Sequence, residues 1–173
     1  MLSRQMKHRI EQDRVLILER EFDAPRELVF EMFKEPEHLR HWWGPKGWDL
    51  PFCKIDFRPS GEWHYCMKCV DRSQGEYYGM ESCGKAIYQD IKEPESIVYI
   101  DYFSDKDGKI DESLPSCKVT IEFIELDGKT KLVNHSEYAS AEALQAVIDT
   151  GMLEGITETW DRLEELLNQL KKG

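Results

Sequence analysis

Two cysteines and three histidines have side chains and spacings that could support metal or acid–base chemistry. Cys66 and Cys69 form a C-x-x-C pair, a spacing that serves zinc sites when a backbone turn brings the two thiolates together. His38 and His41 are three residues apart, so on a helix they would share a face. His64 is a third imidazole, and histidine suits proton transfer near neutral pH.

The surrounding sequence favours ordinary structural roles for these residues. The stretch 62–70 alternates polar and apolar residues as a strand does, so positions three apart point to opposite faces. We therefore predict one buried and one exposed or edge thiol in the C-x-x-C pair. We expect surface positions for the histidines, and we predict no metal site because no third ligand is placed beside them. Nucleophile-elbow, phosphate-loop and dinucleotide-binding motifs are missing from the sequence, so we assign no catalytic residue and no cofactor.

A second set of residues could line a cavity for a ligand. Trp63 and Tyr65 share the apolar face of their strand, and Asn134 and Ser136 share a face with Leu132. The plain alternative is packing in the core, with the polar pair bonded to each other or to water. The candidate ligand-binding residues are Trp63, Tyr65, Tyr88, Tyr102, Asn134, Ser136, Met152 and Ile156.

These residues need a sheet and a long helix to position them. Alternation and turn residues predict a strand over 14–22, two short helices over 26–33 and 37–43, and about six strands between 48 and 138. Hairpin-length turns between the later strands predict an antiparallel sheet. Helical spacing then continues from a cap at Ser140, and Gly151 and Gly155 mark a kink, a break or a close approach to the sheet. We predict an α+β fold with a flexible lead-in over 1–13 and a single domain over 14–171.

Several motifs along the chain resemble those of a known family. They are Phe22-Asp23-Ala24-Pro25, Pro36-Glu37-His38-Leu39, Trp42-Trp43-Gly44-Pro45, the stretch from Asp56 to Tyr65, Gly84-Lys85-Ala86-Ile87-Tyr88, Pro94–Tyr99 and Thr159–Leu163. Together they resemble the AHSA-type branch of the START-like, or SRPBCC, superfamily from about residue 15 to 170. The sequence departs from the family pattern at Ser60, where a second glycine is expected, and at Cys83, where an aromatic residue is common.

The resemblance implies a helix-grip fold, in which a curved antiparallel sheet of about six to seven strands wraps around the long C-terminal helix. It also implies a cavity between that helix, the sheet and the two short helices. We expect a hydrophobic or aromatic small molecule to bind there. The resemblance leaves two alternatives open: an enzyme of cyclase or hydrolase type acting on an apolar substrate in the same cavity, or a chaperone-associated interaction protein. It transfers no catalytic residue, so binding is favoured over catalysis.

Composition limits the partners. The chain has 34 acidic and 23 basic residues and a net charge of -11, which repels phosphate backbones and anionic membranes, so we expect no nucleic acid and no membrane. The N-terminus lacks the apolar core of a signal peptide, so we expect a cytoplasmic location. Five cysteines, an odd number, favour free thiols. The sequence leaves open whether the protein forms a homodimer. Of the partners considered, a chaperone is the one that the sequence supports least.

Overall fold

An eight-stranded antiparallel sheet forms the body of the protein in the computed structural model, which describes residues 6–172. The strands are β1 (Lys7–Glu11), β2 (Val15–Phe22), β3 (Trp48–Ile55), β4 (Glu62–Cys69), β5 (Glu81–Lys92), β6 (Ser96–Ser104), β7 (Cys117–Leu126) and β8 (Lys129–Glu137). The helices are α1 (Arg26–Glu31), α2 (Pro36–Trp42), α3 (Ala141–Ile148) and α4 (Met152–Lys172), with a short 3-10 segment, η1 (Arg72–Tyr77), between β4 and β5. The strand order is β1-β2-β8-β7-β6-β5-β4-β3.

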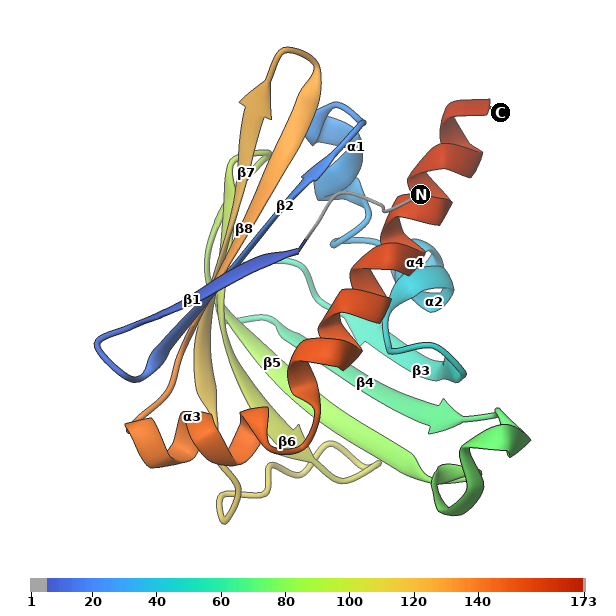
Figure 1. The fold of residues 1–173 in the computed structure, drawn as a ribbon, viewed down its shortest axis with the longest axis vertical. Helices are drawn as coiled ribbons and strands as arrows, with labels where there is room; N and C mark the ends of the chain where they lie inside the picture. Colours follow the sequence, from blue (N-terminus) through green and yellow to red (C-terminus); the bar gives the residue numbers. More distant parts are fainter. Residues whose placement is uncertain (1–5, 173) are drawn as a thin grey trace.

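The sheet curves around α4, so the predicted helix-grip architecture is confirmed (Figure 1). The short helices α1 and α2 follow β2 and cover one end of the concave face, and α3 lies near the start of α4 at the opposite end. Among residues 6–172, no helix is both long enough and apolar enough to cross a membrane.

The additional strand is β1, which lies where we expected a flexible lead-in. It pairs with β2 from Lys7 opposite Glu19 to Glu11 opposite Val15. Its connection to β2 contains two residues of positive φ, Gln12 and Asp13, as hairpin turns of the primed types require. Every residue of β1 is exposed, so the segment carries no apolar alternation that would predict a strand. Residues 1–5 of the expected lead-in lie outside the described residues.

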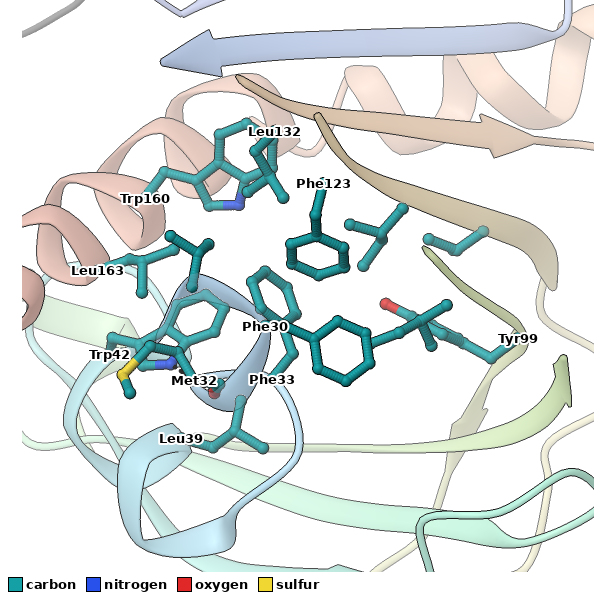
Figure 2. Close-up of a cluster of buried hydrophobic side chains, with 14 of the residues drawn as sticks. Phe30, Met32, Phe33, Leu39, Trp42, Tyr99, Phe123, Leu132, Trp160 and Leu163 are labelled. Carbon is teal, nitrogen blue, oxygen red and sulfur yellow. Dashed lines mark hydrogen bonds between the residues drawn. The ribbon is translucent and has the colours of Figure 1, made fainter. Parts of the chain in front are cut away.

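Aromatic rings fill the end of the concave face beneath α1 and α2. Phe33 contacts both Trp42 and Phe123, at ring-centroid distances of 4.8 and 5.3 Å, and Trp160 of α4 meets Phe22 of β2 at 6.0 Å. Figure 2 shows this cluster between α4, the short helices and the sheet, with Tyr99 on the side away from Trp160. This end of the fold is therefore packed with side chains.

The C-terminal helical region is broken once. Ser140 caps α3 as predicted, because its hydroxyl accepts a hydrogen bond from the Ala143 amide at 3.1 Å. Gly151, with φ of +90°, separates α3 from α4, a backbone conformation that favours glycine. Gly155 continues inside α4, and a side chain there would approach Pro45. The break places the start of α4 beside α3, at the end of the sheet away from α1 (Figure 1).

A disulfide corrects the expectation of free thiols. Cys66 and Cys83 lie directly opposite each other on β4 and β5, with Cα atoms 4.0 Å apart, and their sulfurs are bonded. The two cysteines of the C-x-x-C pair therefore have different roles, because Cys66 forms the disulfide and Cys69 is a buried free thiol. The sequence could not reveal this bond because it depends on the register between two strands. Cys53 and Cys117 are also free.

Candidate ligand-binding site

A pocket of about 210 Å³ lies at the end of the concave face away from the aromatic cluster. Its floor comes from β4, β5, β6 and β7, and its wall comes from α3 and the first residue of α4. The lining residues are Tyr65, Met67, Ser82, Cys83, Asp101, Tyr102, Phe103, Pro115, Cys117, Tyr138, Val147 and Met152. Most of them are aromatic, aliphatic or sulfur-containing, as in small-molecule pockets.

Strand register places a carboxyl in the floor of this pocket. Ala86, Asp101 and Cys117 lie side by side on β5, β6 and β7. Side chains alternate between the two faces of a strand, so Asp101 shares the concave face with the buried Ile97 and Tyr99. The small side chain of Ala86 leaves the carboxyl open to Tyr65 of β4.

Gly84 allows Tyr65 to reach that carboxyl. The two residues are directly paired on β4 and β5, and a Cβ atom built at Gly84 would lie 2.5 Å from the Cζ atom of Tyr65. The ring therefore lies against the bare glycine backbone, and any side chain at this position would displace it. From there the Tyr65 hydroxyl donates a hydrogen bond of 3.2 Å to Oδ1 of Asp101.

Burial dominates the electrostatics of Asp101. Desolvation raises the pKa of its carboxyl from 3.8 to about 7, and the Tyr65 hydrogen bond opposes the rise. Within residues 6–172, none of the ion pairs involves Asp101. Asp101 can therefore change charge near neutral pH, which suits either proton transfer or binding of a charged ligand group.

The neighbouring titratable groups stay neutral at that pH. Burial and the charge of Asp101 raise the pKa of the Cys117 thiol to about 12. Burial likewise holds the pKa of Tyr65, Tyr99 and Tyr138 above the ordinary range of tyrosine. Among the described lining residues, Asp101 is the one group that ionises near neutrality.

Three of the residues expected to bind ligand lie in this lining. Tyr65 forms part of the floor and Met152 part of the helical wall. Tyr102 also borders the pocket, but it pairs with Lys85 and alternates with Asp101, so its side chain belongs to the convex face.

The other five lie outside the lining. Trp63 and Tyr88 are buried in the core, at 3% and 2% exposure. Asn134 and Ser136 point inward as expected, and the Asn134 amide donates to the Ser136 hydroxyl at 2.9 Å. Ile156 is partly buried against the core of the protein.

Among the titratable lining residues, Asp101 and Cys117 were not predicted as candidates, whereas Tyr138 shares the face of Leu132 and was expected to point inward with it. A signal for the first was present, because Asp101 has the same parity as Ile97 and Tyr99 in an alternating strand. The inward position of this carboxyl could therefore have been predicted. Its proximity to Cys117 and Tyr138 could not, since it follows from strand pairing and from the chain path after β8.

The histidines form no site with one another. His38 and His41 lie on α2, whereas Nε2 of His64 contacts the Asp105 carbonyl at 3.2 Å, on the loop after β6. In the part of the chain that the structure describes, no three His, Cys, Asp or Glu residues gather as metal ligands.

Comparisons with known proteins agree with this architecture. A family model described as "Activator of Hsp90 ATPase homolog 1-like protein" matches residues 23–168. The solved structure of protein Ms6760 from Mycobacterium smegmatis is similar, with 30% identity, a TM-score of 0.81, and coverage of 94% of this chain and 95% of that one. Protein NE0264 from Nitrosomonas europaea has 25% identity and a TM-score of 0.78 over 95% and 100% of the two chains. A search of curated proteins finds no match.

Proposed function

Because the chain belongs to the family of activator of Hsp90 ATPase homolog 1-like proteins, we propose that it uses the cavity of this fold to bind a small apolar or aromatic molecule. The site is the pocket between β4–β7, α3 and the start of α4. The observation that supports the proposal is its lining, in which aromatic and aliphatic side chains surround a single carboxyl.

The size of the pocket limits the ligand. A volume of about 210 Å³ equals the share of about seven liquid waters, and it lies below the usual range for drug-sized ligands of about 300–1,000 Å³. We therefore propose a molecule built on one ring, or on an aliphatic chain of similar bulk. The phenyl alcohol 2-phenylethanol is a neutral probe of this class.

Filling the pocket should abolish binding of that probe. Val147 is a partly buried wall residue on α3, so Val147→Trp should place an indole in the space that the ligand would occupy. We expect calorimetric titration to show binding of 2-phenylethanol to the wild-type protein and at least about a tenfold loss of affinity in this variant.

The neighbouring exposed residue provides the control. Ala146 lies on the same helix and outside the pocket lining, so Ala146→Trp adds the same side chain without filling the space. Its affinity for the probe should equal that of the wild-type protein. Equal binding by both tryptophan variants would rule out this pocket as the site, as would a wild-type protein that binds neither this alcohol nor its amine and carboxylate analogues.

Catalysis in the same pocket is a second candidate function, favoured by the pKa of Asp101 near 7. A carboxylate with this pKa can act as a general base at neutral pH. In a hydrolase it would take a proton from the water that attacks the substrate carbonyl. With the single-ring ester 4-nitrophenyl acetate, we expect a hydrolysis rate that rises with pH through about 7 and falls to the background rate in Asp101→Asn. A rate equal to background in the wild-type protein would remove this candidate for esters.

A further inference from the structure

Within residues 6–172, the carboxyl in the pocket has no positively charged partner. The Tyr65 hydroxyl is the hydrogen-bond donor to Asp101, and the ion pairs formed within residues 6–172 lie elsewhere. A carboxylate that leaves water without a cation nearby is costly. A ligand that supplies the missing charge would therefore gain more from this site than a neutral ligand of the same shape.

The groups that face Asp101 from each surrounding element are uncharged at neutral pH. They are Tyr65 on β4, Ala86 on β5, Tyr99 on β6, Cys117 on β7 and Tyr138 after β8. The helices contribute the uncharged Val147 and Met152. The ionisation of Asp101 therefore depends on burial and on what enters the pocket.

The rings in the lining complement a cation on an apolar body. Tyr65 and Tyr138 lie beside the carboxyl, and Phe103, which is 42% exposed, also belongs to the lining. Aromatic faces attract ammonium groups and also pack against a ligand ring. This combination of rings and one carboxylate differs from a purely apolar cavity.

A larger hollow beside the pocket has an excess of negative charge. It encloses about 600 Å³ and shares Ser82, Cys83 and Phe103 with the pocket. Its charged lining residues are Glu81, Asp105, Lys109, Asp111 and Glu112. The chain as a whole has a net charge of -11. A ligand that reaches the pocket by way of this hollow therefore meets a field that attracts cations and repels anions.

We infer that the ligand is an amine cation on a single-ring aromatic or comparable apolar body, with its ammonium group against the Asp101 carboxylate and its ring among the tyrosines. This inference rests on the proposed function, since it assigns the ligand class of the same pocket. No covalent step is involved.

Three probes of matched size and different charge test the ligand class. They are 2-phenylethylamine, 2-phenylethanol and phenylacetate, each titrated calorimetrically into the full-length protein at pH 8, where Asp101 is ionised. We expect the amine to bind at least about tenfold more tightly than the alcohol, and phenylacetate to bind most weakly. At pH 6.5 the amine should also release protons, because it favours the carboxylate form; two buffers of different ionisation enthalpy measure this release.

Two variants locate the effect. Asp101→Asn should reduce the affinity for the amine to that for the alcohol or below, while the affinity for the alcohol changes less than about threefold. Asp90→Asn removes the same charge from an exposed position on β5 and should leave all three affinities unchanged. An amine that binds no more tightly than the alcohol, or an amine preference that survives in Asp101→Asn, would overturn the inference while the apolar pocket stands. If none of the three probes binds, the pocket proposal fails as well.

Discussion

Replacing Asp101 by asparagine should make the protein more stable than the wild type at pH 8, with an advantage that shrinks as the pH falls towards 5. Burial raises the pKa of this carboxyl from 3.8 to about 7 in the folded protein, so the ionised form destabilises the fold. Each pKa unit corresponds to about 1.4 kcal/mol. The difference in unfolding free energy between variant and wild type should therefore grow by about 3 kcal/mol from pH 5 to pH 8.

The direction of this pH dependence follows from proton binding to Asp101. Between the unfolded pKa of 3.8 and the folded pKa of about 7, the folded protein holds a proton that the unfolded chain has lost, so stability from this group falls as the pH rises through that window. Asparagine does not titrate and removes the dependence. Thermal unfolding at pH 5, 6, 7 and 8 measures it, and for a chain of this size a 3 kcal/mol change corresponds to roughly 6–12 °C in Tm.

The control for this result is Asp90→Asn, which removes an exposed carboxyl from β5. The large pH-dependent gain expected of Asp101→Asn should not appear in this variant. A difference between Asp101→Asn and the wild type that is also independent of pH would contradict the expected ionisation of Asp101. The assignment of this carboxyl as the charged group of the pocket would then be wrong.

A destabilising carboxylate in the floor of a pocket is consistent with a role in binding. Cores generally exclude unpaired charges because they cost stability, and proteins accept such costs mainly at functional sites. An apolar residue at position 101 would pack against Ala86 and Cys117 without this cost. The presence of an acid there is the physical reason to seek a ligand of opposite charge.

Local periodicity predicted most of the fold because each element carries its own pattern. Alternation on β4 and β8 correctly placed Trp63 and Tyr65 on one face, and Asn134 and Ser136 on the face of Leu132. Strand β1 escaped prediction because all its residues are exposed. Its position is set by a hairpin turn and by pairing with β2 rather than by an apolar face.

The candidate site was less predictable because it depends on register and on filled volume. Tyr102 was a predicted cavity residue, whereas its neighbour Asp101 has the inward parity on β6, so a shift of one position puts a carboxyl where a ring was expected. The disulfide between Cys66 and Cys83 also depends on register. Large aromatic residues fill one end of the concave face and leave the other open, a result of packing in three dimensions that linear spacing does not record.

The second large effect is expected where α4 meets the sheet. The Arg20 side chain on β2 is fully buried, and its guanidinium contacts Asp161 at 2.8 Å and Glu164 at 3.1 Å, both on α4. Replacing both acids, as Asp161→Asn with Glu164→Gln, would leave a buried cation without a carboxylate. Such a loss typically costs about 3–5 kcal/mol of unfolding free energy, which chemical denaturation at pH 7 would measure.

Removing the cation as well should reverse most of that loss. Arg20→Met keeps the apolar length of the side chain and eliminates the buried charge, so by itself it should cost less than the double acid replacement. In the background of the two acid replacements it should raise stability, which gives a positive coupling in the double-mutant cycle. A different result would be a loss of unfolding free energy on Arg20→Met both in the wild-type protein and in the variant that lacks the two acids. The packing of Arg20 against Phe22, whose ring centre lies 5.4 Å from the guanidinium, would then contribute more to stability than the ion pairs.

Loss of the contact between Arg20 and α4 should also affect the pocket. Because α4 begins at Met152 in the pocket wall, the two acid replacements should weaken binding of 2-phenylethanol.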